Sequence, residues 1–437
     1  MLIQKSDKLT LDITQCNLRS RILFYMEQKG WKQKDLEEAT GVHKSTLSKL
    51  LKGERQINLE QIDAITDALG LSKGELYHDF VSECVDENGK FKVAKSEEFI
   101  ISCYQANLPQ LAKAITDELL NQDIKNNKDI VLRISDKLYE NKMYDYALSL
   151  YDEIIKEEQK KSSKLAVCYF RKFMILRDQD LQGKGREALF RLLDYLPILP
   201  DEYTQVNGQK YNVKLDAYYR VLTFFNVMEE WDNLLSYAQE LEVIAKSLND
   251  QKYLGEALLY QGFAYKGKGD FISVFNVINR YSMINDYYKH LSVGSRLFTK
   301  IEMGDIESIP LYLKWCSDDK DICTLIPIAV EAYYKNGLLS EGVNFIRHYI
   351  PYIEQLSKKT FIPDVKRYMR FKHAEALLYI ETSNMIDGLK AAIKTIELAK
   401  NLGNINRLTS CMSLIYKNYQ FMNDELKEEL QMVLERR

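Results

Sequence analysis

The sequence predicts an all-α protein that begins with a small bundle of short helices and continues as a long array of helix pairs. Only 7 of its 437 residues are proline and 19 are glycine, against roughly 5% and 7% in average proteins. Apolar residues recur with the spacing of helices along most of the chain. Because helix breakers are scarce and the apolar period is helical, we expect the all-α fold class.

Composition excludes several classes of protein. Apolar residues make up 46% of the chain and aromatic residues 11%, enough for a large core, so disorder, collagen and a small disulfide-stapled scaffold are ruled out. The formal charge is −3, from 60 basic and 63 acidic residues. Any surface that binds anions must therefore be local.

The protein is expected in a reducing cytoplasm. Its seven cysteines are scattered, odd in number and without a C-x-x-C spacing, which predicts neither disulfides nor a zinc cluster. The N-terminus lacks the basic-then-apolar pattern of a signal peptide, and no apolar run reaches the 18 residues of a membrane span. We expect no membrane partner.

Residues 14–80 divide into five short helical patterns. In the first, Leu18, Ile22 and Met26 recur at i+4 before Gly30, the residue type that commonly ends a helix. A tight Gly-Val turn separates the second pattern from the third. The fourth and fifth patterns each begin with two residues, three positions apart, that resemble a capping box. The other four are expected at 32–40, from 43 or 44 to 52, from Asn58 (with Gln61) and from Ser72 (with Glu75).

Two short helices joined by a tight turn form the helix-turn-helix plan, whose second helix lies in the DNA major groove. Here that helix is KSTLSKLLK, at residues 44–52. Its period places Leu47 and Leu50 inside, with Val42 and Leu36, and turns Lys44, Ser45 and Lys49 outward. Segment 43–55 holds four cations and one acid, a local charge of +3.

Residues 32–55, KQKDLEEATGVHKSTLSKLLKGER, resemble the Cro/C1-type (XRE) helix-turn-helix family over about residues 17–77. Two residues depart from its pattern: Glu37 replaces a small alanine and Lys32 a Ser/Thr cap, which is expected to loosen the helix pair slightly. The resemblance implies base contacts by Lys44, Ser45 and Lys49, with Thr46 in the same DNA-binding set. It implies positions near phosphates for Gln33, His43, Lys52 and Arg55.

Residues 81–94 are expected to be a linker, because residues 78–95 lose the helical period and contain an Asn-Gly pair. The domain boundaries are thus 1–80 for DNA binding, 81–94 for the linker and 95–437 for the array. The array divides into about nine helix pairs of about 38 residues, within the range of helical repeats. The pairs are expected near 95–122, 127–158, 163–197, 212–246, 250–283, 289–317, 321–357, 364–400 and 404–436.

The segment LLYQGFAYKGKGDF, which ends at Phe271, resembles the signature of tetratricopeptide (TPR) repeats. Weaker echoes lie at 142–148, 228–233, 301–306 and 334–339. The resemblance implies a right-handed α-solenoid whose concave face is lined by the first helix of each pair and suits an extended peptide. For each residue projected there, an ordinary solvated helix position is the competing interpretation. The candidate peptide-binding residues are Asp216, Tyr219, Thr223, Asn226, Glu256, Arg370 and His373.

No catalytic constellation is recognisable. The five histidines are dispersed, and the QGKGR segment at 182–186 lacks the spacing of a phosphate-binding loop. No G-x-S-x-G elbow or nucleophilic cysteine signature occurs. We expect a non-enzymatic protein with no cofactor and no metal.

The whole architecture resembles the peptide-pheromone-responsive regulators of the RRNPP group, with the arbitrium (AimR-like) phage receptors as a narrower possibility. The resemblance implies a cytoplasmic transcription factor that binds double-stranded DNA and a short signalling peptide and forms a homodimer through its C-terminal repeats. The alternative is a TPR adaptor that binds a partner protein and is localised to DNA by its helix-turn-helix module. A phosphatase-like enzyme ranks third.

Overall fold

The computed structural model describes residues 17–121, 127–158, 160–206 and 208–435. Within these ranges the regular structure is helical apart from one short hairpin and one isolated β-bridge, which confirms the all-α fold class. The chain divides into two compact units, Met1–Ile175 and Leu176–Arg437. Each unit is described by itself below.

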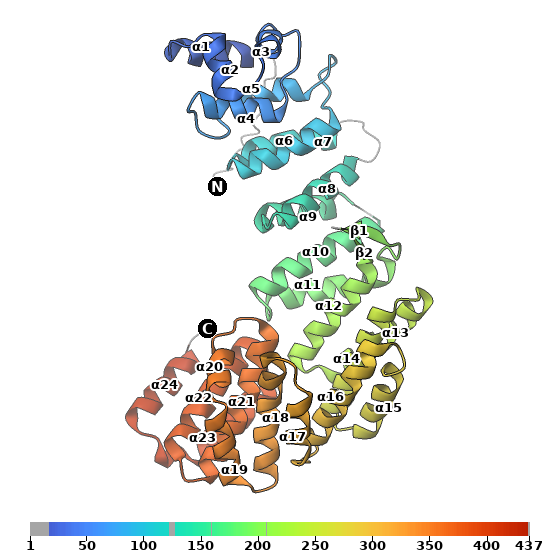
Figure 1. Cartoon of the computed structure of the whole chain (residues 1–437), viewed down its shortest axis with the longest axis vertical. Coiled ribbons are helices and arrows are strands. Elements are labelled where there is room, and N and C mark those ends of the chain that lie inside the picture. Colours follow the sequence, from blue (N-terminus) through green and yellow to red (C-terminus); the bar gives the residue numbers. More distant parts are fainter. Residues whose placement is uncertain (1–16, 122–126, 159, 207, 436–437) are drawn as a thin grey trace, which may run out of the picture. The chain divides into compact units, whose positions relative to one another are not determined.

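Unit 1 opens with the predicted small bundle, drawn in blue in Figure 1. Leu18, Ile22 and Met26 are buried on the first helix as predicted, and the inward residues Leu36, Leu47 and Leu50 are fully buried. Val42 is half-buried and packs against the same core. The helices are α1 (Leu18–Gln28), α2 (Gln33–Thr40), α3 (Lys44–Leu51), α4 (Leu59–Ala68) and the single-turn α5 (Tyr77–Phe80).

The fifth helix does not open at Ser72, so that prediction is wrong. The segment after Gly70 forms turns, and α5 begins only at Tyr77. Gly74 has φ +85°, and a Cβ there would lie 2.9 Å from the side chains of both Ala106 and Leu108. A left-handed backbone cannot continue a right-handed helix, and only glycine fits this close approach.

The segment predicted as a linker is held by structure of its own. It contains a 3-10 helix, η2 (Val81–Cys84), and a β-bridge between Val85 and Phe91 around the expected Asn-Gly turn. Phe80 makes an edge-to-face contact with Phe99 of α6 (Val93–Gln105), at 4.9 Å between ring centroids. The DNA-binding module and the first array helices therefore share one core.

Within the described residues, nine helix pairs follow, close to the expected positions, with one extra short helix, α20 (Ile350–Ser357), after the seventh. In unit 1 and across its end the pairs are α6 with α7 (Pro109–Asn121), α8 (Asn127–Glu140) with α9 (Tyr144–Glu157), and α10 (Ser163–Gln179) with α11 (Lys184–Leu193). In unit 2 they are α12 (Val213–Met228) with α13 (Trp231–Ser247), α14 (Gln251–Gly267) with α15 (Phe271–Tyr281), α16 (Asp286–Glu302) with α17 (Ser308–Trp315), α18 (Asp319–Lys335) with α19 (Leu339–His348), α21 (Ile362–Glu381) with α22 (Met385–Leu402), and α23 (Ile405–Lys417) with α24 (Asp424–Glu435). Two further 3-10 turns are η3 (Leu196–Ile198) and η4 (Tyr419–Phe421).

The same turn joins many of these helices. One residue adopts a left-handed backbone two positions before the next helix begins, as Gly269 does (φ +76°) before Phe271. Glu229 before Trp231 and Lys142 before Tyr144 do so without being glycine. Because this geometry ends one helix and starts the next within three residues, it explains why the helices pack as antiparallel pairs.

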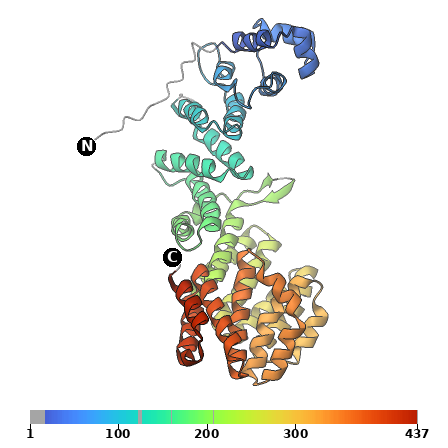
Figure 2. The ribbon, with the colours of Figure 1, turned by 90° about the vertical axis from the view of Figure 1, so that its left-hand side faces the viewer.

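Besides the Val85–Phe91 bridge, the described residues contain a hairpin between α11 and α12 that the sequence does not predict. Its strands, β1 (Thr204–Val206) and β2 (Gln209–Tyr211), are antiparallel with Thr204 opposite Tyr211. Gly208 turns the chain with φ +76°. Figure 2 shows the hairpin projecting from the helices of unit 2. Among the described helices, none combines the length and apolar character that crossing a membrane requires.

Candidate DNA-binding surface and ligand cavity

The recognition helix α3 is fixed at its start by two of its own predicted DNA-contacting residues. His43 is the N-cap, and its Nδ1 accepts a hydrogen bond from the Ser45 backbone N–H at 3.2 Å. The same nitrogen lies 2.8 Å from the Ser45 hydroxyl. Both side chains are exposed, so they can also reach a ligand.

Glu37 tightens the helix pair rather than loosening it, contrary to the expectation. Its carboxylate accepts a hydrogen bond of 2.8 Å from the Lys44 backbone N–H at the start of α3. A carboxylate is stabilised at a helix N-terminus by free N–H groups and by the helix dipole. At the start of α2 the Ser/Thr cap is missing, but Asp35 in the first turn accepts from the Lys32 backbone N–H at 2.7 Å, which is the reciprocal half of a capping box.

The predicted outward face of α3 is exposed. Lys44, Ser45 and Lys49 are all solvent-accessible, as are Lys52 and Arg55 in the turn that follows the helix. The other two predicted DNA contacts, Gln33 and Thr46, are half-buried. The described geometry thus leaves the cationic segment available to the phosphates and base edges of DNA.

Arg19 of α1 holds the far end of the recognition helix, a role that the sequence analysis missed. Its Nε donates to the Leu50 carbonyl at 2.8 Å, and a terminal nitrogen donates to the Arg55 carbonyl at 3.3 Å. The other terminal nitrogen pairs with Glu83 at 2.8 Å. Glu83 also accepts from the buried backbone N–H of Ile57 at 3.0 Å. These contacts fix the loop that carries Lys52 and Arg55.

Unit 2 contains a cavity of about 1120 Å³, called the ligand cavity below. It is larger than the ~300–1000 Å³ typical of sites for small ligands. Its walls come from the end of α10 and from the first helix of each pair between α12 and α23, with the residues before α21. The first helices of these pairs, which were predicted to line the peptide-binding face, therefore surround a cavity.

Five of the seven predicted peptide-binding residues line this cavity. Tyr219, Thr223 and Asn226 follow one stripe of α12, and Arg370 and His373 lie on α21. The other two do not line it. Asp216, one turn before Tyr219, is buried and bonds Arg220 at 3.1 Å and the Tyr211 hydroxyl at 3.3 Å.

Glu256 lies one turn before Tyr260, which does line the cavity. Its side chain is half-buried, and burial raises the pKa of its carboxyl group. Glu256 therefore lies on the same face of α14 as Tyr260, but one turn outside the cavity.

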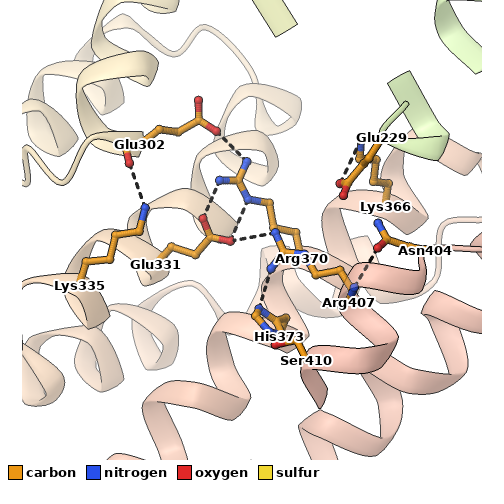
Figure 3. Close-up of polar contacts among 10 residues, drawn as sticks. All are labelled: Glu229, Glu302, Glu331, Lys335, Lys366, Arg370, His373, Asn404, Arg407 and Ser410. Carbon is orange, nitrogen blue, oxygen red and sulfur yellow. Dashed lines mark hydrogen bonds and ion pairs between the residues drawn. The ribbon is translucent and has the colours of Figure 1, made fainter. Parts of the chain in front are cut away.

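Arg370 is the centre of a partly buried ion cluster that joins three helices (Figure 3). Its guanidinium bonds both oxygens of Glu331 on α18, at 2.9 and 2.6 Å, and Glu302 on α16 at 2.8 Å. Burial alone would raise the pKa of Glu331, but Arg370 and then Arg407 lower it to about 2. Since all three guanidinium nitrogens are engaged, Arg370 shapes the cavity more than it offers donors to a ligand.

His373 extends the cluster to α23. Its Nδ1 lies 2.6 Å from an Arg407 nitrogen and its Nε2 lies 2.9 Å from the Ser410 hydroxyl. Because guanidinium only donates, Nδ1 accepts and Nε2 carries the proton. Burial, followed by the charge of Arg407, lowers the pKa of His373 to about 4, so this imidazole is neutral at pH 7.

Lys366 lies one turn before Arg370 and faces the same cavity. Its ammonium lies 3.5 Å from Glu229 and 5.1 Å from the centre of the Trp231 ring, and it donates to the Asn226 carbonyl. Burial lowers the pKa of Lys366 to about 8, although Glu229 opposes the shift. Arg370 and Arg407 lower it further.

The cluster carries an excess of positive charge. Three cations, Lys266, Arg370 and Arg407, share only two carboxylates: Glu302 and Glu331. Since each of these carboxylates is shared by two cations, an anionic group in the cavity would be stabilised. The charged residues lining the cavity are the cations Arg177, Arg220, Lys266, Lys320, Lys366, Arg367, Arg370 and Arg407 and the acids Asp178, Glu229 and Glu302.

The sequence contained a signal for one of the cavity residues that were not predicted, Lys366. Lys366 precedes Arg370 by four positions, and residues four apart share one helix face. Extending the predicted stripe of α21 by one turn would have included it. Arg407 and Ser410 on α23 had no comparable signal, because they become neighbours of His373 only through the packing of the last pairs.

Comparison with known families identifies only the N-terminal module. No curated protein matches the chain. Residues 22–76 match the helix-turn-helix family model, over the segment that contains the recognition helix and its supporting turns. The chain therefore carries a Cro/C1-type helix-turn-helix domain followed by a helical region, which supports a role as a DNA-binding regulator of transcription.

Proposed function

We propose that this regulator binds a short signalling peptide in the ligand cavity and that the peptide changes how the chain binds DNA. Residues 1–80 would bind the operator, through the eight predicted DNA contacts, and residues 95–437 would form a TPR-like peptide-binding and dimerisation array. Such a receptor serves quorum sensing or the arbitrium decision between lysis and lysogeny. The single observation that carries the proposal is the cationic cavity lined by the first helices of the pairs.

The cavity has the chemistry that a free peptide requires. Asn226 can donate to and accept from a peptide backbone, and Tyr219 offers a ring edge and a hydroxyl group. The excess positive charge of the ion cluster favours the C-terminal carboxylate. Among the cluster members, Arg407 has guanidinium donors beyond those that bond His373 and Glu331.

A homodimer through the C-terminal repeats is supported by large apolar side chains exposed there. The outer face of a terminal repeat is usually polar, but Tyr416 is 84% exposed and Ile405 75% exposed. These two are eleven residues apart on α23, three helical turns, and so share one face. A second copy would cover this face in a two-fold interface. The exposed residues are Ile405, Tyr416, Tyr419, Phe421, Met432 and Leu434.

Regulation would follow by population shift. If the peptide binds one curvature of the array better than another, it changes the spacing of the two DNA-binding domains in the dimer. Two half-sites are engaged only when that spacing matches the helical repeat of DNA. A peptide with equal affinity for both curvatures would regulate nothing.

The test is a thermal-shift screen with synthetic peptides of five to ten residues with free C-termini. A bound peptide is expected to raise the melting temperature of unit 2 by several degrees. Asn226→Ala should reduce that shift, since it removes the side chain but keeps the carbonyl that bonds Lys366. Asn344→Ala on α19, an exposed position outside the cavity, is the matched control.

The competing adaptor function gives a different result in the same screen. An adaptor would respond to a folded partner protein and to no short peptide. A screen without any stabilising peptide, together with stabilisation by a folded partner, would replace the proposal by the adaptor function.

A further inference from the structure

A second hollow in unit 2, of about 250 Å³, opens beside the ligand cavity and is called the apolar annex below. The two hollows share the wall residues Phe263, Lys266, Phe298, Lys320, Thr324 and Arg367. The two hollows are therefore adjacent, and a peptide in the ligand cavity would lie beside the annex.

The interior of the annex is built from apolar side chains of four consecutive helices, α14 to α17. Its further walls include Leu259, Val274, Ile278, Leu291, Tyr312 and Trp315. An engineered apolar cavity of about 150 Å³ accepts benzene. A hollow of about 250 Å³ is thus large enough for one bulky aliphatic or aromatic side chain.

Trp315 contributes a polar group to this apolar wall. Its Nε1 atom is buried and has no hydrogen-bond partner among the described residues. The indole packs against Gly294, where a Cβ would lie 2.5 Å from the ring. A buried donor without a partner is unfavourable, and an occupant whose acceptor reached Nε1 would remove that cost.

The wall shared with the ligand cavity is cationic. Lys266 pairs with Glu302 at 3.1 Å and Arg367 pairs with Asp364. Lys320 is exposed and has no ion pair within the described part of the chain. The acid that lines the annex, Asp321, accepts from the Ser317 backbone N–H at 3.2 Å. Acceptors on a peptide backbone or terminus suit this wall.

We infer that the apolar annex is a subsite that selects a bulky aliphatic or aromatic side chain of the peptide, next to a carboxylate or carbonyl held at Lys320. The inference rests on the proposed peptide-binding function and adds its side-chain preference. A residue with both features is a leucine or phenylalanine at or near the C-terminus of the peptide.

The three tryptophans of the chain provide separate reporters for the test. Trp315 lines the annex, Trp231 lines the ligand cavity, and Trp31 lies in the DNA-binding module. The full chain is labelled with ¹⁵N-tryptophan, and the indole resonances are assigned with Trp315→Phe and Trp231→Phe. The probes are N-acetyl-L-leucine, N-acetyl-L-phenylalanine and N-acetylglycine.

We expect the leucine and phenylalanine probes to shift the Trp315 resonance and to bind at least tenfold more tightly than N-acetylglycine. Lys320→Ala should weaken both by several-fold. Lys314→Ala, which removes an exposed lysine of α17 outside both hollows, should leave them unchanged. The Trp31 resonance should remain in place.

Other outcomes separate the two proposals. Movement of Trp231 without Trp315 would overturn the annex subsite and leave peptide binding in the ligand cavity intact. Equal binding of all three probes, or no response of Trp315, would overturn the subsite too. A Trp315 response while no peptide raises the melting temperature would retain the subsite and reject the peptide-binding function.

Discussion

The Arg19 guanidinium lies 2.8 Å from the Glu83 carboxylate and thereby joins the first helix of the DNA-binding module to the segment predicted as a linker. The Glu83 side chain is only 5% exposed, and its second oxygen accepts from the Ile57 backbone N–H at 3.0 Å. Ile57 follows the loop that carries Arg55. The end of the recognition helix is therefore positioned by residue 83, outside the family-like motif.

Glu83→Ala should destabilise the DNA-binding module by about 3 kcal/mol, because it leaves a largely buried guanidinium and a buried N–H without partners. We expect backbone amides of α3 to exchange with deuterium about 100-fold faster in the full chain. Glu87→Ala, an exposed acid of the neighbouring turn, should change nothing. Unaltered protection of α3 in Glu83→Ala would show that the ion pair does not support the recognition helix.

Lys49 and Lys52 should have different roles in DNA binding, although both are exposed cations. Lys49→Ala should cost about 1–3 kcal/mol on the specific site and blur the preference at one base pair. Lys52→Ala should weaken binding to all DNA sequences alike and reduce the slope of log affinity against log salt concentration by about 1. Selection from random duplexes and salt titrations measure both effects, with exposed Lys73 as the control position for alanine. Indistinguishable behaviour of the two variants would mean that α3 enters the groove in another orientation.

The pKa of His373 predicts a loss of stability in mild acid. The folded-state pKa is about 4 and the unfolded value about 6.5, so the unfolded chain binds the extra proton between these values. Stability is therefore full above pH 6.5 and falls as pH decreases toward 4, by about 2 kcal/mol between pH 7 and pH 5. Hydrogen exchange of α21 in wild type and His373→Gln measures this difference.

The His373→Gln variant should lack this part of the pH dependence, because glutamine does not titrate. Carboxylates elsewhere titrate in both proteins, so only the difference between them is informative. An identical pH dependence would mean that His373 is not held neutral by Arg407 and burial.

The sequence predicted the fold more completely than the site. Helix pairs depend on local patterns, such as the Gly269–Phe271 turn, and these are visible in one sequence. The stripe Tyr219, Thr223 and Asn226, which lines the ligand cavity, was predicted for the same reason. The Arg19–Glu83 pair was missed because contacts between residues distant in sequence follow from packing and not from periodicity. The Glu37 cap on Lys44 spans only seven residues, but it depends on the geometry of the turn between the two helices, which periodicity does not describe.

Lys366 should make the binding of an anionic ligand sensitive to alkaline pH. Its pKa is about 8, so the ammonium loses its charge as pH rises through 8. The affinity of a peptide with a free C-terminal carboxylate should then fall up to about tenfold between pH 7 and pH 9. Calorimetric titration at both pH values measures the change.

Lys366→Arg should flatten this profile, because a guanidinium keeps its charge over the whole range. Lys390→Arg, at an exposed position on α22, is the control and should keep the wild-type profile. A carboxylate peptide whose affinity is constant across pH 8 would place its anionic group away from Lys366.

Replacing each of two glycines of unit 2 by alanine should have opposite effects on stability, because an aromatic ring packs at very short distance against only one of the two. A Cβ at Gly294 would lie 2.5 Å from Trp315, whereas a Cβ at Gly262 would lie 3.4 Å from Val277. Removing a mid-helix glycine contributes about 1 kcal/mol of stability, but overpacking costs about 1–3 kcal/mol. Gly294→Ala should therefore lower the melting temperature and shift the Trp315 indole resonance, while Gly262→Ala is neutral or stabilising. An unshifted indole in Gly294→Ala would show that Trp315 is not seated on Gly294, and the wall of the apolar annex would have to be redrawn.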